Sequence, residues 1–212
     1  QGEQGTAKTT AMRFLTALID PSSVPTRKPP RDVDSWVTAA AGSWVVGIDN
    51  LSVVPDWLSD SLCRAVTGDG DIRRRLYTDS DHSVFAFRRV VLLTSIDLGS
   101  LRGDLVERMV PITLTSIPDH RRLKETDVLE AWDEAHPRIF GALLDLAVKV
   151  LAIKPSVKLQ RYPRMADFAE VLAAVDKVLA TSGFQRYVDS MGAMDRDSLT
   201  SDPFLLALAD NG

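Results

Sequence analysis

The sequence contains one cysteine, Cys63, among 212 residues. A single thiol cannot form a disulfide within the chain, so nothing indicates a secreted, cross-linked fold. No apolar run approaches the roughly 20 residues that span a bilayer, and no signal peptide opens the chain. We therefore expect a cytoplasmic protein that has no membrane partner.

A strong excess of one charge is also missing, because 25 Lys and Arg residues face 29 Asp and Glu residues and leave a formal net charge of -4. This balance excludes a globally basic nucleic-acid protein, so any DNA contact must use a local patch. The three histidines and one cysteine form no cluster in the sequence, which leaves no basis for a metal site beyond Mg²⁺. Hydrophobic residues make up 45% of the chain, enough for a real core.

Strand and helix patterns alternate over the first half of the chain. Apolar runs at 44–49 and 90–95 predict buried strands of a parallel sheet, and 110–114 predicts a third. Helical spacing predicts helices over 11–19, 32–41 and 56–67, with Asp32 as an N-cap. Segments 73–77 and 83–87 flank a polar tip and predict a β-hairpin. The alternation indicates an α/β fold.

The second half of the chain is helical in period, over 121–135, 137–153, 166–179 and a shorter stretch at 184–189. We expect Pro137 in the first turn of its helix. The predicted organisation is an α/β core over 1–117, a helical lid over 118–190, and a tail over 191–212 that leads toward a further domain. Because the chain starts at Gln1 without methionine, we expect a fragment of a larger protein that lacks the strand before Gly2.

The start of the chain matches the phosphate-loop pattern G-x-x-x-x-G-K-[ST] with one departure, Ala7 where glycine is usual. Backbone N–H groups of such a loop cradle phosphates, and the following helix adds its positive N-terminal end. Lys8 would neutralise phosphate charge, and Thr9 would ligate Mg²⁺. An ordinary glycine-rich turn before a helix is the alternative. The predicted nucleotide-binding residues are Gly2, Glu3, Gln4, Gly5, Thr6, Ala7, Lys8, Thr9 and Thr10.

Polar residues end the two predicted strands, at the sheet edge where open α/β folds bind ligands. Asp49 would hold the Mg²⁺ hydration shell beside Thr9, although an Asp that caps the next turn is the alternative. Asn50 can orient water but cannot accept its proton. Thr94 or Ser95 would sense the terminal phosphate, unless they only end the strand. Arg108, or as a second choice Arg102, would reach the ATP of a neighbouring subunit; an ion pair with Asp104 or Glu107 is the alternative.

The ordered set of the phosphate loop, Val-Val-Gly-Ile-Asp-Asn, Leu-Leu-Thr-Ser and Asp-Leu-Val-Glu-Arg resembles the core of AAA+ ATPases. It is most similar to helicase-like ATPases of phages and integrated mobile elements, often fused to or encoded beside a primase, and to superfamily 3 helicases. The resemblance covers residues 2 to 117 well and the helical remainder loosely. Arg64-Ala65-Val66-Thr67-Gly68-Asp69-Gly70 looks especially like the mobile-element group.

The resemblance implies a P-loop NTPase sheet of strand order 5-1-4-3-2, a helical lid, and ATP sites between the subunits of a homo-oligomeric ring, usually hexameric. It implies ATP and Mg²⁺ as ligands, single- or double-stranded DNA as a partner, and an upstream domain such as a primase. It also implies that Arg164, at the start of a lid helix, touches the phosphates as a second sensor; a surface Arg at a helix end is the alternative. Ala7 and Asn50 depart from the usual pattern, so hydrolysis is expected to be slow or to use another base.

The predicted hairpin supplies a candidate DNA contact. Arg73, Arg74 and Arg75 lie on one arm and His82 lies near the tip. In superfamily 3 helicases, which this region resembles, a hairpin before the sensor strand enters the central channel and grips DNA. Asp79 and Asp81 at the tip would repel phosphate, so a charge-balanced hairpin is the alternative. The sequence thus favours an ATP-driven helicase or replication motor. The second hypothesis is a nucleotide-gated regulatory ATPase with little turnover.

Overall fold

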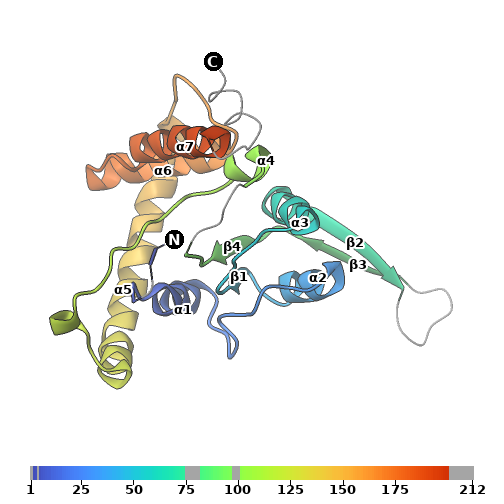
Figure 1. The fold of residues 1–212 in the computed structure, drawn as a ribbon. Helices are drawn as coiled ribbons and strands as arrows, with labels where there is room; N and C mark the ends of the chain where they lie inside the picture. Colours follow the sequence, from blue (N-terminus) through green and yellow to red (C-terminus); the bar gives the residue numbers. More distant parts are fainter. Residues whose placement is uncertain (1, 4, 75–81, 97–100, 201–212) are drawn as a thin grey trace, which may run out of the picture. The chain divides into compact units, whose positions relative to one another are not determined.

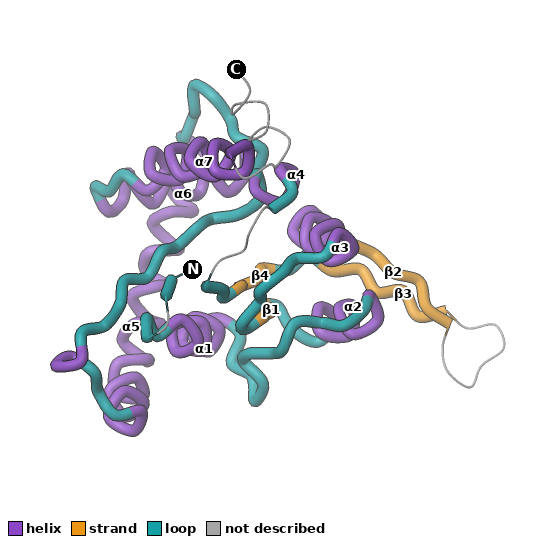
Figure 2. The backbone as a smooth tube through the Cα atoms, in the orientation of Figure 1, coloured by secondary structure: helices purple, strands orange, loops and turns teal. Residues whose placement is uncertain are grey.

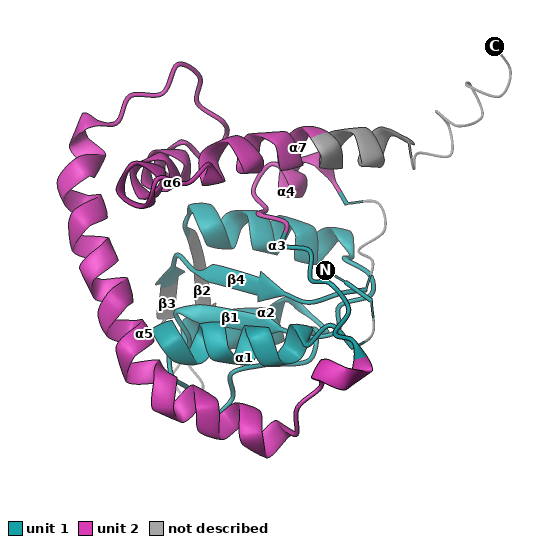
Figure 3. Cartoon of the chain, turned by 90° about the vertical axis from the view of Figure 1, so that its left-hand side faces the viewer, with its two compact units in different colours: residues 1–101, 112–118 teal, residues 102–111, 119–212 magenta. Residues whose placement is uncertain are grey.

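The computed structural model describes residues 2–3, 5–74, 82–96 and 101–200. The chain forms two compact units (Figure 3). The sheet unit comprises Gln1–Leu101 and Ile112–Pro118, and the helical unit comprises Arg102–Pro111 and Asp119–Gly212. The helical unit therefore includes the short segment from Arg102 to Pro111 as well as the long C-terminal part. Among the described helices, none combines the length and the apolar character needed to cross a membrane.

The sheet unit is built from alternating helices and strands (Figure 1). Its elements are α1 (Lys8–Ile19), α2 (Val33–Ala41), β1 (Val45–Ile48), α3 (Asp56–Thr67), β2 (Asp69–Arg74), β3 (His82–Phe87) and β4 (Val90–Leu93). The predictions of helices over 11–19, 32–41 and 56–67 and of strands over 44–49 and 90–95 are confirmed, with ends shifted by a few residues. The predicted burial is found in β1 but not in β4, where Val90 is exposed and the other three residues are half-buried. Asp32 caps α2 as predicted: its carboxylate accepts from the N–H of Ser35 at 2.7 Å.

β1 is the central strand of a parallel arrangement. It pairs with β4 in parallel, in the register Val45↔Val90 to Ile48↔Leu93. On its other edge, Arg27 forms a parallel bridge with Ile48. Two hydrogen bonds hold this bridge, from the N–H of Arg27 to the carbonyl of Gly47 at 2.9 Å and from the N–H of Asp49 to the carbonyl of Arg27 at 2.8 Å. The spatial order is therefore the Arg27 segment, then β1, then β4.

Helices cover both faces of this small sheet, which explains why all four residues of β1 are buried. α1 and α3 lie on opposite sides of β1 and β4 (Figure 3). On the α1 face, Gly47 leaves no room for a side chain: a Cβ there would lie 2.6 Å from the carbonyl oxygen of Pro25 and 3.0 Å from Sδ of Met12. On the opposite face, Trp36, Val46 and Leu58 form a core that is almost completely buried. The strand is thus fixed between two helical layers.

The prediction of a third strand at 110–114 is wrong, because the structure has no strand there. A strand exists only where a neighbour satisfies its backbone groups. Within the described residues this segment instead borders the N-terminal loop. The N–H of Ile117 reaches the carbonyl of Gly5 at 3.4 Å, and a Cβ on Gly2 would lie 2.7 Å from the carbonyl oxygen of Leu114. Val110 and Ile112 of the apolar run are themselves exposed, at 45% and 60%.

The predicted hairpin is confirmed, with strands that begin earlier on the first arm than expected. β2 and β3 pair antiparallel, in the register Asp69↔Phe87 to Arg74↔His82 (Figure 2). α3 ends at Gly68, whose φ of 118° lies in the left-handed region that favours glycine, and β2 begins at the next residue. β2 packs beside α3, and β3 packs beside α2. The predicted tip over 79–82 lies outside the described residues except for His82.

The helical unit contains α4 (Gly103–Val106), α5 (Glu125–Ile153), α6 (Ala166–Leu179) and α7 (Gly183–Thr200). The expected break at Pro137 is wrong, because α5 continues through Pro137 as one helix of 29 residues. Proline removes one hydrogen bond from a helix, and helical residues on both sides keep theirs. α7 is longer than the predicted helix over 184–189. Val150, Val157 and Ala174 form the buried core where α5 meets α6.

Asp176 joins α6 to α7. Its carboxylate accepts hydrogen bonds from the backbone N–H groups of Gly183 at 2.7 Å and Phe184 at 2.8 Å, and from the hydroxyl of Thr181 at 2.5 Å. Burial of Asp176 opposes its ionisation, but these hydrogen bonds outweigh that effect and lower the pKa of the carboxyl from its ordinary value of 3.8. The ionised form of Asp176 therefore stabilises the start of α7.

Asp176→Ala should lower the free energy of unfolding by roughly 1 kcal/mol near neutral pH, as loss of a helix cap does. Since the folded pKa is lowered, the contribution of Asp176 is fully present above the ordinary value of 3.8 and is lost as pH falls through the folded pKa. Chemical unfolding followed by circular dichroism at neutral and at acid pH measures this difference. Asp145→Ala, an exposed Asp on α5, is the control. An equal gap between wild type and Asp176→Ala at both pH values would contradict the assignment.

Candidate functional site

The N-terminal loop turns sharply before α1. Gly5 has a φ of 77° and Ala7 a φ of 56°, so both lie in the left-handed region. Left-handed backbone costs a residue with a Cβ about 1–2 kcal/mol, and glycine avoids this cost. The structure thus gives a conformational reason why glycine is usual at the position of Ala7. Of the loop residues predicted to bind nucleotide, Gln4 lies outside the described residues.

Lys8 is directed at the loop that precedes it. Its Nζ donates to the carbonyl of Gly2 at 2.5 Å and to the carbonyl of Glu3 at 2.7 Å. Thr6, which is buried, donates its hydroxyl to the same carbonyl of Glu3 at 2.9 Å. Lys8, Thr9 and Thr10 form the first turn of α1, with Lys8 half-buried. The result is a compact loop that closes around an ammonium group at the N-terminus of a helix.

Asp49 receives hydroxyl groups from two other elements. Thr9, on α1, donates to both carboxylate oxygens of Asp49 at 3.1 Å. Thr94, directly after β4, donates to Oδ1 of Asp49 through a short hydrogen bond. Asp49 itself follows β1, so α1, β1 and β4 meet at one carboxylate. The predicted pairing of Thr9 with Asp49, and the position of Thr94 beside them, are therefore present in the geometry.

Asn50 has a backbone role that the sequence did not indicate. Its φ of 57° is left-handed, a conformation in which Asn is several-fold enriched. Its N–H donates to the hydroxyl of Thr94 at 2.9 Å, while its side chain is exposed. The next N–H, of Leu51, donates to the carbonyl of Thr94 at 2.9 Å. Ser95, the alternative sensor, has an exposed fraction of only 3%. Within the described residues, no hydrogen bond joins it to Asp49.

Arg108 and Arg164 share one acid within the helical unit. Arg108 donates to a carboxylate oxygen of Asp104 at 2.5 Å and to the carbonyl of Asp104 at 2.7 Å. Arg164 contacts the same oxygen at 2.7 Å and Glu107 at 2.8 Å. Only 12% of the Arg108 side chain is exposed, and its Nε is buried without a partner in the described part of the chain. The ion pair weighed as the alternative for Arg108 is thus the arrangement found.

The predicted DNA contact is described only in its backbone. Arg73 and Arg74 lie in β2 opposite Ser83 and His82 of β3, respectively. Arg75 lies outside the described residues. The antiparallel register places the basic residues of one arm against the start of the other arm.

Oxygen groups suited to Mg²⁺ are present at Thr9 and Asp49. Magnesium in proteins is commonly held by one or two carboxylates together with several waters and substrate phosphates. Thr9 and Asp49 fit this pattern, because a hydroxyl and a carboxylate lie at hydrogen-bond distance. No cluster of three or more His, Cys, Asp or Glu suited to a metal occurs among the described residues.

Sequence reasoning missed a cavity of about 280 Å³ in the sheet unit. Its wall combines the segment from Arg27 to Arg31 with residues of α2 and β1. The signal in the sequence was the run Arg-Lys-Pro-Pro-Arg between two predicted helices. The sequence alone could not show that apolar side chains from α2 and β1 would meet behind this run.

Comparison with models of protein families identifies the family of this chain. A family model described as actinomycete integrative conjugative element replication protein matches residues 1–197. Comparison with curated proteins and with solved structures gave no significant match. The match spans the sheet unit and the helical unit as far as the greater part of α7. The expected link to replication of mobile elements is therefore confirmed, and the chain belongs to the family of actinomycete integrative conjugative element replication proteins.

Proposed function

We propose that this replication protein binds ATP with Mg²⁺ at the loop formed by residues 2–9 and hydrolyses it to drive work on DNA. The observation that carries the proposal is the convergence at one sheet edge of Lys8, Thr9, Asp49 and Thr94. Asp49 and Thr94 are far from Lys8 and Thr9 in the sequence, and each of the four is of the type that phosphate and Mg²⁺ chemistry needs at its position.

The phosphates would bind at the N-terminal loop. An ammonium group, Lys8, lies within the loop, and α1 begins directly behind it. A helix N-terminus attracts anions through its free N–H groups and its dipole. Lys8 now donates to two loop carbonyls, so it is already oriented toward the space that the loop encloses. A bound phosphate would replace or share these weaker acceptors.

Thr9 and Asp49 would hold the Mg²⁺ ion and its waters. When bound, this ion neutralises charge on the phosphate oxygens of the nucleotide. Within the chain, Asp49 orients the hydroxyl of Thr9, and Thr94 donates to the same carboxylate from the neighbouring strand. Thr94 thus lies where it can respond to the state of the nucleotide through Asp49.

The strand order supports an AAA+-like, P-loop core. The described order of the Arg27 segment, β1 and β4 corresponds to strands 2, 3 and 4 in the order 5-1-4-3-2. The segment after Ile112 lies along the N-terminal loop, on the side where that order has strands 5 and 1. The helical unit would be the lid, with Arg164 two residues before α6.

A nucleotide-gated switch with little turnover is the second candidate. Asn50 follows Asp49 where many such ATPases carry a Glu, and an amide cannot accept a proton from water. The left-handed backbone and the N–H bond to Thr94 explain an Asn at this position by conformation alone. This second candidate keeps nucleotide binding and ATP-dependent assembly, without strand separation.

As a motor, the protein would work as a homo-oligomeric ring of six subunits, with an upstream partner domain such as a primase. Arg73, Arg74, Arg75 and His82 of the hairpin would pair with backbone phosphates of single- or double-stranded DNA without reading sequence. Arg108 would act on the ATP of a neighbouring subunit, which requires its pair with Asp104 to open.

Lys8→Ala should abolish ATP binding and hydrolysis while the fold is kept, because the variant removes the only side-chain cation among the described residues 2–10. Binding of a fluorescent ATP analogue and phosphate release, each with and without single-stranded DNA, measure the two effects. Lys177→Ala, an exposed lysine on α6, is the control. Unchanged nucleotide affinity in Lys8→Ala would disprove the proposed site. Binding without turnover in the wild type would favour the switch over the motor.

Ala7→Gly should raise the free energy of unfolding by roughly 1 kcal/mol, because glycine avoids the strain of a left-handed Ala and this gain is reduced by the greater freedom of glycine in the unfolded chain. Ala180 at the end of α6 has a φ of 54°, so Ala180→Gly is a matched control with the same relief. Both variants should raise the melting temperature, while nucleotide affinity changes only in Ala7→Gly. Equal nucleotide affinity in both variants and the wild type would separate residue 7 from the binding site.

Arg108→Ala should keep ATP binding and lower hydrolysis by about 1000-fold or more, which is the effect of removing an arginine that acts on transition-state charge. Phosphate release at saturating ATP, beside the fluorescent binding assay, measures this split. Arg138→Ala is the control, because Arg138 is largely exposed on α5. A normal rate of hydrolysis in Arg108→Ala would restrict Arg108 to its ion pair with Asp104.

A further inference from the structure

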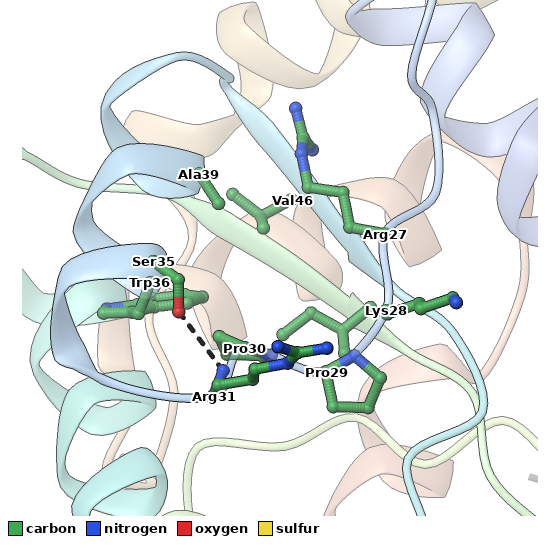
Figure 4. A pocket seen from close by; sticks show the side chains of 10 residues that line it. Arg27, Lys28, Pro29, Pro30, Arg31, Ser35, Trp36, Ala39 and Val46 are labelled. Atoms are coloured by element: carbon green, nitrogen blue, oxygen red, sulfur yellow. Dashed lines mark hydrogen bonds between the residues drawn. The ribbon is translucent and has the colours of Figure 1, made fainter.

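The cavity of about 280 Å³ in the sheet unit has an apolar interior. Its floor is formed by Val46 and Ile48 of β1 and Trp36 of α2, each at most 1% exposed. The accessible apolar surface is at its mouth, on Ala39 of α2 and the ring of Pro30 (Figure 4). Small-molecule pockets commonly measure roughly 300–1,000 Å³. The cavity lies just below this range, so it suits one planar ring system rather than a large ligand.

Three cationic side chains line the rim of this cavity, but their surroundings differ. The guanidinium of Arg27 donates to the hydroxyl of Ser43 at 2.8 Å, and Figure 4 shows its side chain running away from the prolines. Lys28 and Arg31 lie on either side of Pro29 and Pro30, and both are exposed. Neither forms an ion pair among the described residues, although the charge of Arg31 interacts with the carboxylate of Asp32 next to it. In a chain with a net charge of -4, two such cations beside one apolar cavity form a local positive site.

The cavity and the Asp49 cluster lie on opposite faces of β1. Side chains alternate along a strand, so Val46 and Ile48 face one side while Gly47 and Asp49 face the other. Gly47 lies against Met12 of α1, and Asp49 accepts from Thr9 of α1. Ile48 lines the cavity on the face of α2. The two sites therefore share a strand end but no side chain.

We propose that this cavity is a second binding site, which takes one nucleotide unit of single-stranded DNA. The base would lie against Pro30 and Ala39 at the mouth of the cavity, and the adjoining backbone phosphate would pair with Lys28 and Arg31. Apolar walls accept any base, so recognition should be tolerant of sequence, as in other single-strand sites. The proposal requires no ATP hydrolysis and does not depend on the hairpin, so it stands or falls separately from the proposed function.

The test uses the full chain without ATP and a fluorescein-labelled oligothymidylate of about 12 nucleotides, within the usual site sizes for single strands. Lys28→Glu combined with Arg31→Glu should weaken binding by about 10-fold or more at low salt, and should reduce the slope of log affinity against log salt by about 0.7 per lost phosphate contact. Lys158→Glu with Arg161→Glu is the matched control, because these exposed residues have the same types and the same spacing. Equal loss in both double variants would overturn the proposal.

A second variant separates the cavity from the charges. Ala39→Leu fills the mouth of the cavity without changing any charge, so it should weaken oligonucleotide binding while the salt slope stays the same. A melting temperature close to that of the wild type establishes that the variant folds. In parallel, photocrosslinking of an oligonucleotide that carries 5-iodouracil, mapped by mass spectrometry, should label the peptide around residues 28–39 in the wild type. This second readout does not require any variant to fold. Labelling only at other segments would overturn the site.

Two further arms identify the source of the nucleotide and separate the two proposals. Thymidine monophosphate should compete far more weakly than the oligonucleotide; competition at equal affinity would overturn the assignment to DNA in favour of a free nucleotide. Lys8→Ala should bind the oligonucleotide normally while it fails to bind ATP. Loss of DNA binding in Lys8→Ala would place the DNA contact at the N-terminal loop instead and overturn the inference.

Discussion

The carboxylate of Asp49 is the contact on which the sheet unit depends. It is the point where hydroxyls from α1 and from the end of β4 meet the end of β1. An ionised acid accepts several hydrogen bonds without donating any, so one residue can orient both hydroxyls. The bonds made by the N–H groups of Asn50 and Leu51 to Thr94 then fix the turn that follows. The proposed phosphate chemistry depends on this arrangement, because it brings Thr9 and Thr94 to one place.

Much of the sheet unit could be predicted because local patterns and tertiary structure agree there. Buried strands of a parallel sheet are continuous apolar runs, and β1 and β4 both have this form. The run at 110–114 is also largely apolar, yet strand formation needs a pairing partner, which a local pattern cannot show. Pro137 was misleading because proline marks a helix start in many proteins, whereas α5 continues through it as one helix, at a point where Pro137 is exposed.

The candidate site could also be predicted only in part. Lys8, Thr9 and Asp49 belong to motifs whose spacing carries their chemistry, so the sequence was enough to bring them together. The conformations of Ala7 and Asn50 could not be inferred, since φ is a property of the folded turn. The cavity beside Arg31 also escaped prediction, because its walls come from three separate segments. Charge patterns were a partial guide to pairing: they offered the ion pair of Arg108 with Asp104 as an alternative, but they did not indicate that Arg164 contacts the same carboxylate.

A backbone hydrogen bond links Asp49 to the segment that forms the rim of the cavity. The N–H of Asp49 donates to the carbonyl of Arg27 at 2.8 Å, so the residue that would face Mg²⁺ and the segment that forms the cavity rim share a backbone contact. A ligand that shifts Asp49 would also alter the free energy of arranging the rim. By thermodynamic linkage, any such coupling is reciprocal: whatever factor a nucleotide applies to the affinity for DNA, DNA applies to the affinity for that nucleotide. The proposed nucleotide site and the proposed DNA site would then be connected through β1, a buried strand of only four residues.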